Sequence, residues 1–363
     1  MRDRLLELAI AIQQVPAPTF EEGARANFVQ AKFAEAGLED VSQDELGNVY
    51  GRLAGTGLGM PLVAVAHLDT VFPHETPLEV RDEGDRIYGP GLGDNSIGVA
   101  ALVELALLIR QRRIELGGDL WLVANVGEEG LGDLRGMRKV VERFGAAVQG
   151  YLVIEGLALG HVYHRAVGVR RYRVIARTAG GHSWSDFGQP SAVHELARLV
   201  IQITTLHVPV TPRTTLNVGV IAGGTTVNTL AAEAWFELDL RSESSEALIV
   251  LAEQAGKLVA AANRPGVSVE AQLIGHRPAG EIPTHHRFIQ LGLNCLAQQG
   301  LSGNLTSGST DANIPLSLGI PAVVLGVTTG GGAHTRKEFI LTEPIEQGMN
   351  HLVCFVGRAW EEG

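Results

Sequence analysis

The sequence predicts an α/β protein in which helices cover both faces of a mainly parallel sheet, with a second, smaller domain inserted into it. Over residues 61–155, uninterrupted apolar runs of strand length alternate with helical patterns. This alternation is typical of a parallel sheet buried on both faces. After about residue 166 the strands acquire one polar face, and the elements follow the order β-α-β-β-α-β. That order predicts a split βαβ (ferredoxin-like) domain.

The expected elements follow from the spacing of apolar residues and from the turns between them. In the first region they are strand Leu62–Ala66, helix Ile97–Arg113, strand Leu120–Val126, helix Leu134–Phe144 and strand Leu152–Ile154. In the inserted region they are strand Val167–Thr178, helix Ala192–Thr205, strands Thr215–Ile221 and Ala231–Arg241, helix Ser245–Asn263 and strand Val267–Leu273. The last region is expected to contain helix His286–Gln299, strand Ala322–Leu325 and helix Glu343–Trp360. We therefore predict a large domain made of residues 1–165 and 276–363, interrupted by a small domain at 166–275.

Composition and charge exclude several classes of protein. The chain has 363 residues, 45% of them hydrophobic, and a formal net charge of −11. These values are typical of a folded globular protein, and an acidic chain without a Lys/Arg cluster argues against a nucleic-acid partner. We recognise no signal peptide and no run of eighteen apolar residues, so we expect no membrane span and a cytoplasmic location. Cys295 and Cys354 lie in apolar, helix-like surroundings, and we expect free thiols, with a disulfide as the alternative.

Residue types that bind metal ions follow several of the predicted strands, or lie in glycine-rich turns. They are His67 and Asp69 after the first strand, Asp94 in Gly89–Ser96, Glu128 and Glu129 after the second strand, Glu155 after the third, and His334 in Gly330–His334. Ligands of open α/β sheets bind outside the carboxyl ends of the strands, so these side chains can converge. Two imidazoles and three carboxylates are too many for one tetrahedral zinc and suit two cations that share a bridging ligand.

Taken alone, each motif also has an ordinary structural explanation. His67 and Asp69 point to the same side of an extended segment, as a ligand and its orienting carboxylate would, but Asp69 could simply cap a turn. Asp94 could cap the helix that follows it. The adjacent Glu128 and Glu129 repel each other unless a cation is near, although a solvated acidic turn would tolerate them. The complete ordered set favours a metal site.

In this order and spacing, the motifs resemble the dinuclear zinc exopeptidase family of glutamate carboxypeptidase, acetylornithine deacetylase, succinyl-diaminopimelate desuccinylase, aminoacylase and peptidase T. The resemblance covers nearly the whole chain, including the position of the inserted domain. It implies that His67 and Glu155 bind one Zn²⁺, that Glu129 and His334 bind the other, and that Asp94 bridges them. Co²⁺ or Mn²⁺ could also occupy such a site.

The resemblance implies catalytic roles for residues beside these ligands. Asp69 would orient His67, Glu128 would be the general base, and the peptide bond after Asp94 would be cis. His182, in Gly-Gly-His-Ser, matches a histidine that reaches into the partner subunit's active site and stabilises the oxyanion. A homodimer formed through the inserted lid domain would follow. The match is partial, because Trp-Ser-Asp follows where small residues are usual, and a histidine that caps a hairpin is the alternative.

Four further residues match positions that contact the substrate in this family. They are Asn228, Arg241, Ser309 and Thr310. The guanidinium group of Arg241 suits a terminal carboxylate, with a surface salt bridge as the alternative explanation.

Together these features predict a metal-dependent hydrolase that cleaves amide bonds of small peptides or N-acyl amino acids. Two zinc ions would activate a water molecule, with Glu128 as the base. In the family, Glu at the position of Glu155 is more typical of carboxypeptidases and deacylases, and Asp of aminopeptidases. A di- or tripeptide aminopeptidase stays open, because Gly127–Gly132 resembles tripeptidase-like members. A two-metal phosphoesterase and a non-catalytic binding protein on the same fold are the remote alternatives.

Overall fold

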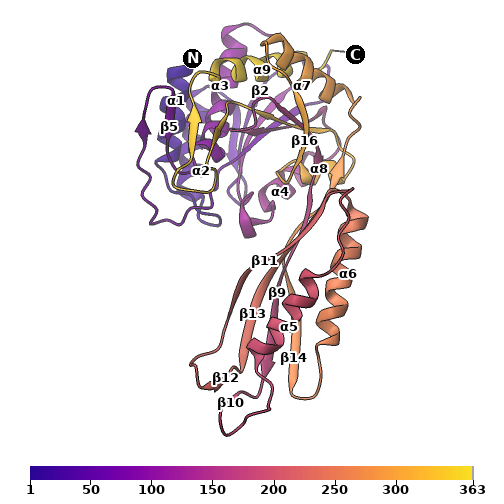
Figure 1. Ribbon diagram of the computed structural model, residues 1–363. Helices are drawn as coiled ribbons and strands as arrows, with labels where there is room; N and C mark the ends of the chain where they lie inside the picture. Colours follow the sequence, from indigo (N-terminus) through magenta and orange to yellow (C-terminus); the bar gives the residue numbers. More distant parts are fainter. Residues whose placement is uncertain (362–363) are drawn as a thin grey trace. The chain divides into compact units, whose positions relative to one another are not determined.

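A computed structural model describes residues 1–361 of the chain. The chain forms two compact units, one from Met1–Ala166 together with the chain from Glu281 onward, and one from Val167–Gly280. In Figure 1, the indigo and purple first part of the chain and the orange and yellow last part belong to the same unit. The inserted unit continues past the predicted end at residue 275, because strand β14 (Val267–Arg277) is longer than its apolar pattern suggested.

The large unit contains a nine-stranded sheet with the strand order β1-β2-β6-β3-β7-β17-β8-β15, and β16 pairs with β8. These strands are β1 (Glu39–Gln43), β2 (Val49–Leu53), β3 (Leu62–His67), β6 (Leu120–Asn125), β7 (Gly150–Glu155), β8 (His161–Ala166), β15 (Gly280–Glu281), β16 (Asn304–Gly308) and β17 (Ala322–Gly326). Strands β6, β3, β7 and β17 are neighbours and run parallel. Nearly all their side chains are buried, as expected when helices cover both faces of a parallel sheet.

The helices of this unit lie on both sides of the sheet, with α3, α7 and α9 on one side and α4 and α8 on the other (Figure 1). They are α1 (Arg2–Gln13), α2 (Gly23–Glu35), α3 (Ile97–Gln111), α4 (Arg135–Phe144), α7 (Arg287–Gln298), α8 (Asn313–Ser317) and α9 (Ile345–Arg358). A small sheet of β4 (Arg81–Asp82), β5 (Arg86–Tyr88), β18 (Gly330–Gly331) and β19 (Phe339–Leu341) adjoins them in the same unit. The predicted α/β class with a mainly parallel sheet is confirmed.

The stretch Leu92–Gln111, which includes α3, is the one described helix long and apolar enough to cross a membrane by length and composition. Within the protein, 89% of its apolar window is buried. A helix that is apolar on all sides is expected in the core of a large domain as well as in a membrane. Strands β3, β6 and β7 pack against α3, so this helix belongs to the core of the large unit.

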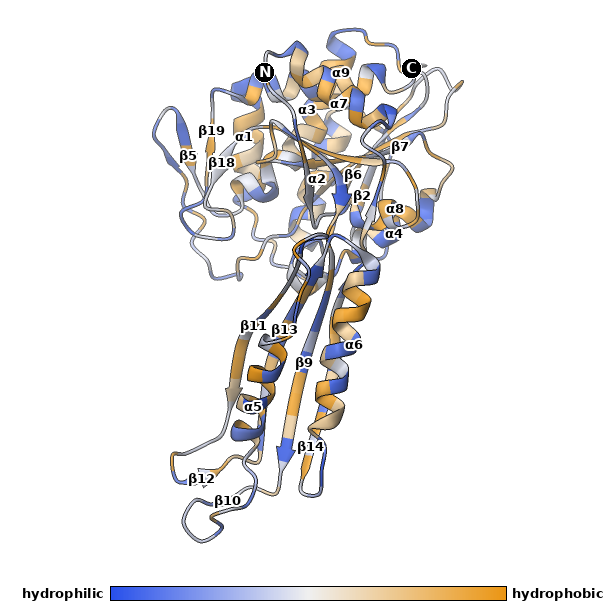
Figure 2. Cartoon of the chain, turned by 45° about the vertical axis from the view of Figure 1, so that its right-hand side comes forward, coloured by the Kyte–Doolittle hydropathy of each residue, from blue (hydrophilic) through white to orange (hydrophobic). Residues whose placement is uncertain are grey.

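The inserted unit contains an antiparallel sheet with the strand order β11-β13-β9-β14. Its elements are β9 (Gly168–Thr178), α5 (Ala192–Thr204), β11 (Thr214–Gly223), β13 (Glu233–Ser242), α6 (Ser245–Ala261) and β14, with a short ribbon of β10 (Gly181–His182) and β12 (Thr229–Leu230). Alternate side chains of β13 are buried, and they pack with apolar residues of α5 and α6. Figure 2 shows the matching alternation of hydrophobic and hydrophilic residues along these elements.

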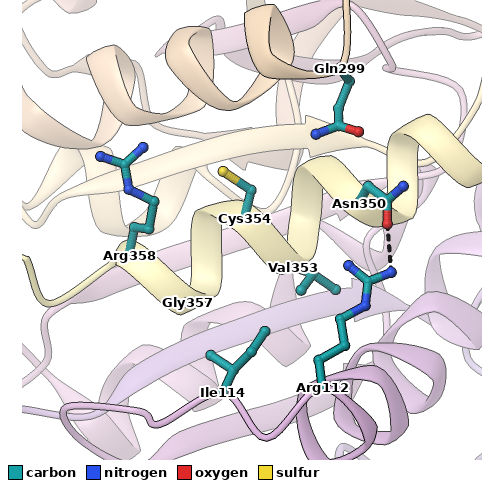
Figure 3. A pocket seen from close by; sticks show the side chains of 8 residues that line it. All are labelled: Arg112, Ile114, Gln299, Asn350, Val353, Cys354, Gly357 and Arg358. Carbon is teal, nitrogen blue, oxygen red and sulfur yellow. Dashed lines mark hydrogen bonds between the residues drawn. The ribbon is translucent and has the colours of Figure 1, made fainter.

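The expectation of free thiols is wrong. Cys295 of α7 and Cys354 of α9 form a disulfide. The two helices pack side by side and bring the Cα atoms within 5.8 Å of each other, a distance that a disulfide spans. Cys295 is buried, whereas Cys354 lines a surface pocket together with Arg112 and Arg358 (Figure 3). Because the cysteines are 59 residues apart in the sequence, their pairing depends on how the helices pack.

Candidate metal centre

The candidate ligands lie where neighbouring parallel strands end. His67 is the last residue of β3 and Glu155 the last residue of β7. Glu128 and Glu129 follow β6 after Gly127, whose φ of 67° favours glycine. Because β6, β3 and β7 are parallel neighbours, their carboxyl ends meet at one edge of the sheet.

Asp94 lies between two groups of ligands and offers one carboxylate oxygen to each. Its Oδ1 is 3.1 Å from Nε2 of His67, and its Oδ2 is 3.1 Å from Nε2 of His334. Nε2 of His67 is also 3.8 Å from Oε2 of Glu155, and Nε2 of His334 is 3.0 Å from Oε1 of Glu129. The arrangement is that of a bridging carboxylate with one imidazole and one further carboxylate on each side.

Two groups of three side chains could therefore each hold a cation. Within each group, one ligand atom per residue lies within 4.8 Å of the others; the groups are His67, Asp94 and Glu155, and Asp94, Glu129 and His334. A third combination joins His67 to Glu128 and Glu129. Imidazole and carboxylate are the ligand types of catalytic zinc sites, so the residues present fit two such ions.

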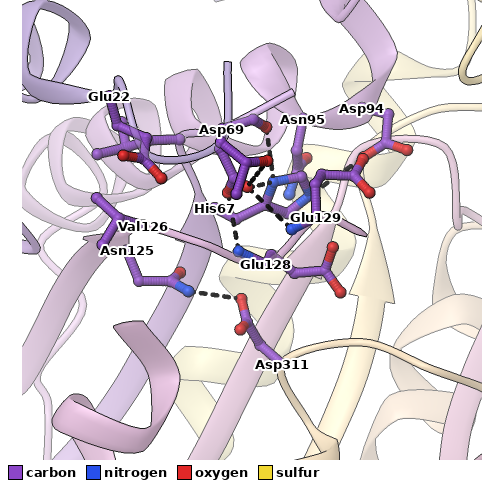
Figure 4. Close-up of polar contacts among 12 residues, drawn as sticks. Glu22, His67, Asp69, Asp94, Asn95, Asn125, Val126, Glu128, Glu129 and Asp311 are labelled. Atoms are coloured by element: carbon purple, nitrogen blue, oxygen red, sulfur yellow. Dashed lines mark hydrogen bonds and ion pairs between the residues drawn. The ribbon is translucent and has the colours of Figure 1, made fainter. Parts of the chain in front are cut away.

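Asp69 holds the two adjacent glutamates through their backbone. Its Oδ1 accepts the N–H of Glu128 and its Oδ2 that of Glu129, both at 2.9 Å (Figure 4). Its Oδ2 also accepts the hydroxyl of Thr19 at 2.8 Å. Nδ1 of His67 lies 3.0 Å from the backbone oxygen of Asp69 but 3.6 Å from the nearer carboxylate oxygen. Asp69 therefore orients His67 mainly through its carbonyl group, while its carboxylate fixes the Glu128–Glu129 turn.

Asn95 ties the turn that carries Asp94 to the end of β7. Its Nδ2 donates to the carbonyl of Ile154 at 2.7 Å, and its Oδ1 accepts the N–H of Gly156 at 2.9 Å. These two residues flank Glu155, so one amide group fixes the turn on both sides of that ligand. The predicted cis peptide bond is present between Asp94 and Asn95.

The electrostatics of the centre are those expected of clustered ligands. Burial lowers the pKa of His67, but the nearby carboxylates of Asp69, Asp94 and Glu155 raise it well above its ordinary value. Contacts with Asp94 and Glu129 raise the pKa of His334 to about 10. Bound metal ions would supply positive charge next to these carboxylates.

Sequence reasoning missed Arg25, a buried cation behind the centre. Its guanidinium group donates to the carbonyl of Leu68 at 2.7 Å and to that of Val15 at 2.8 Å. Burial lowers its pKa to about 10, and the charge of Asp69 acts in the opposite direction. Arg25 lies on α2, far from any recognised motif, and no pattern in the sequence marks it.

Asp311 and Asn125 form a second buried pair that the sequence did not reveal. Nδ2 of Asn125 donates to Oδ2 of Asp311 at 2.8 Å, and both residues are fully buried (Figure 4). Burial raises the pKa of Asp311 to about 7. Thr310, one of the predicted substrate contacts, is buried just before it, and its N–H donates to the side chain of Asn313. Ser309 precedes them, directly after β16.

His182 and Asn228 come together in the short ribbon of the inserted unit. The backbone N–H of Ser183 donates to the carbonyl of Asn228 at 2.9 Å. His182 is exposed, and its Nδ1 accepts the N–H of Trp184 at 3.2 Å. An acceptor at Nδ1 leaves the proton of a neutral imidazole on Nε2, which makes Nε2 the donor atom.

Arg241 does not join them. It lies on β13, where its Nε donates to Oδ1 of Asp239 at 2.7 Å. The structure therefore shows the salt bridge that was the alternative explanation for this residue.

The Peptidase family M20/M25/M40 model matches residues 63–358, which is most of the chain. The chain belongs to this family. A peptidase M20 domain-containing protein of Schizosaccharomyces pombe is 31% identical over 237 residues, which cover 62% of this chain and 56% of that protein. Carboxypeptidase G2 of a Pseudomonas species is 29% identical over 115 residues, 29% of this chain and 27% of its own length. The chain spans about half the length, or less, of these two curated relatives.

Solved structures of M20 peptidases share the fold over the full chain. A tripeptidase of Staphylococcus aureus aligns with a TM-score of 0.84 and 22% identity, covering 100% of this chain and 99% of the other. Aminopeptidase PepT of Bacillus cereus gives 0.80 and 21%, with 99% of each chain covered. YXEP of Bacillus subtilis, a dinuclear metal-binding M20 peptidase, gives 0.72 and 17%, covering 98% and 97%. These likenesses show that the chain has the fold of M20 peptidases.

Proposed function

We propose that this M20 hydrolase uses two zinc ions to cleave the amide bond beside a free carboxylate in small peptides or N-acyl amino acids. The observation that carries the proposal is the position of Asp94, whose two oxygens each lie 3.1 Å from a different imidazole. A carboxylate shared in this way could bridge a pair of metal ions. Co²⁺ or Mn²⁺ could replace zinc at these ligands.

His67, Asp94 and Glu155 would hold one ion, and Asp94, Glu129 and His334 the other. Bound ions would polarise the scissile carbonyl and lower the pKa of a water molecule. Glu128, whose backbone is fixed by Asp69, would accept the proton of the attacking water and deliver it to the leaving nitrogen.

Glu155 and the sequence relatives support a carboxylate-recognising enzyme. In resembling exopeptidases, glutamate at this position accompanies carboxypeptidase and deacylase activity. Carboxypeptidase G2 and a probable carboxypeptidase of Trichophyton verrucosum are among the relatives, the latter 23% identical over 343 residues. The second candidate is a di- or tripeptide aminopeptidase. It is favoured by the fold-level likeness to the tripeptidase and to PepT.

A library of N-acyl amino acids and free di- and tripeptides, analysed by mass spectrometry, separates the two candidates. We expect zinc-loaded protein to cleave N-blocked substrates. We expect Glu128→Gln to lose about 10²- to 10⁴-fold in kcat, because it removes the general base, while its bound metal is unchanged. Cleavage confined to peptides with a free amine would establish the aminopeptidase instead. Two bound metals without any turnover would favour a binding protein.

His182 would stabilise the oxyanion in a partner subunit, which makes a homodimer part of the proposal. Its exposed position and its Nε2–H donor support this role. Mixing inactive Glu128→Gln and His182→Ala subunits tests it. If His182 acts in trans, mixed dimers regain one complete site, and roughly a quarter of the wild-type activity returns after random exchange. No recovery from dimers shown to be mixed would contradict action in trans. The cytoplasm is the proposed location.

A further inference from the structure

Glu338 is a fully buried carboxylate that none of the proposed catalytic roles uses. It lies four residues after His334 and immediately before β19. Its Oε1 accepts the backbone N–H groups of Gly93 at 2.7 Å and Asp94 at 3.0 Å, and its Oε2 accepts that of Gly91 at 3.0 Å. Three donors on one short turn therefore converge on a single side chain.

Glu338 is buried and binds three backbone N–H groups of one turn, which is more than a surface loop needs to be anchored. Across the described residues, Glu338 has no ion-pair partner, so backbone N–H groups are what offsets the cost of burying its carboxylate. The turn it holds is irregular: Gly91 has a φ of 73°, and Asp94 lies outside helical geometry although a helix follows. Regular helical geometry therefore does not fix the position of Asp94. The hydrogen bonds from this turn to the Glu338 side chain can fix it instead.

The clamp also connects two ligands of the same candidate metal site. The segment from His334 to Glu338 is compact, because Thr335 donates its N–H to Gly332 and Glu338 donates its own to Thr335. At its end, the side chain of Glu338 holds the turn of Asp94. Asp94 and His334 are 240 residues apart in the sequence, and Glu338 fixes their relative position from within four residues of one of them.

We propose that Glu338 is a positioning residue that holds Asp94 between the two metal sites by accepting the N–H groups of Gly91, Gly93 and Asp94. The inference rests on the proposed two-metal function and adds a residue to its machinery. Removing one oxygen acceptor would release the turn and shift Asp94 away from the shared position. Metal affinity and geometry would then change before the fold does, because partners that orient metal ligands typically affect affinity about 10- to 100-fold.

The decisive variant is Glu338→Gln, which keeps the shape of the side chain but replaces one acceptor oxygen with an NH₂ donor. Whichever way the amide is turned, a donor then faces at least one backbone N–H. The matched control is Thr342→Val, which removes the bond from the hydroxyl of Thr342 to the carbonyl of Gly84, at 2.9 Å. That bond anchors the end of the same small sheet and does not touch the turn of Asp94.

Metal-free proteins are titrated with Co²⁺ by calorimetry and visible absorption, and urea unfolding is followed in parallel. We expect wild type and Thr342→Val to bind two Co²⁺ with the same spectrum. For Glu338→Gln we expect at least one Co²⁺ to bind about 10- to 100-fold more weakly, with an altered spectrum. We also expect kcat to fall while KM changes little. Glu338→Asp, which keeps the charge but is one methylene shorter, should give an intermediate defect.

Unchanged Co²⁺ affinities and spectrum in folded Glu338→Gln would overturn the inference and leave the proposed function intact. If Glu338→Gln does not fold, wild-type Co²⁺ binding by folded Glu338→Asp would overturn it equally, and a selective metal defect would support it. Fewer than two Co²⁺ bound by wild type would instead contradict the two-metal function and remove the basis of the inference.

Discussion

Replacing Asp69 with Asn tests how the centre is built. The carboxylate accepts three hydrogen bonds, from the N–H groups of Glu128 and Glu129 and from the hydroxyl of Thr19. An amide has one acceptor atom, so at least one buried N–H loses its partner and faces an NH₂ group instead. Leaving a buried donor unpaired costs about 1–3 kcal/mol, and a bond to a charged group is at the upper end of that range.

Removing the charge of Asp69 does not offset this cost. Burial raises the pKa of Asp69, but His67 and the N–H groups of Glu128 and Glu129 lower it below its ordinary value. The protein therefore stabilises the charged form, and we expect Asp69→Asn to lose about 2–3 kcal/mol of stability. For a domain of this size, that loss lowers Tm by roughly 4–6 °C. Displacement of Glu128 should also reduce kcat by about 10²-fold, because small misplacements of a catalytic group are costly.

Differential scanning calorimetry of the metal-free and metal-loaded forms measures the stability, and turnover of the best library substrate measures kcat. Thr19→Val is the matched control, because it removes one donor to Asp69 and leaves both backbone bonds in place. We expect it to lose much less than Asp69→Asn in both assays. If Asp69→Asn unfolds within about 2 °C of wild type and retains its kcat, the Asp69 carboxylate does not hold the Glu128–Glu129 turn in place.

Two further predictions concern pH and the disulfide. The raised pKa values of His67 and His334 contribute stability that is present below pH 6.5 and lost as the pH rises through the folded values, about 10 for His334. The urea midpoint of metal-free protein should therefore fall between about pH 6.5 and 10, and bound metal should flatten this dependence. Cys354→Ser should cost up to about 4 kcal/mol for a loop closed across 59 residues. Two titratable thiols in native protein isolated without reductant would show that Cys295 and Cys354 are not joined.

The parts of the fold that depend on local pattern were predictable from the sequence. Strand β3 and helix α3 lie within a residue or two of their apolar runs, and the metal-binding residue types converge because their strands are parallel neighbours. Residues recruited from elsewhere were not predictable. Arg25 and Glu338 bind backbone carbonyl and N–H groups of other segments. Almost every residue has such groups, so no sequence motif identifies these contacts. The disulfide was missed because its geometry arises from the packing of two helices.

Because the inserted unit interrupts the large one, the ligands of the two candidate metal groups are completed at different stages of synthesis. His67, Asp94 and Glu155 all precede the insertion, whereas His334 follows Glu155 by 179 residues. During synthesis, one complete set of ligands is therefore available long before the other, since chains emerge from their N-terminal end. Both groups nevertheless share Asp94, and the turn that carries Asp94 is held by Glu338, which also follows the insertion. Neither group therefore reaches its final geometry until the chain has returned to the large unit, so full metal occupancy would report that both segments of that unit have joined.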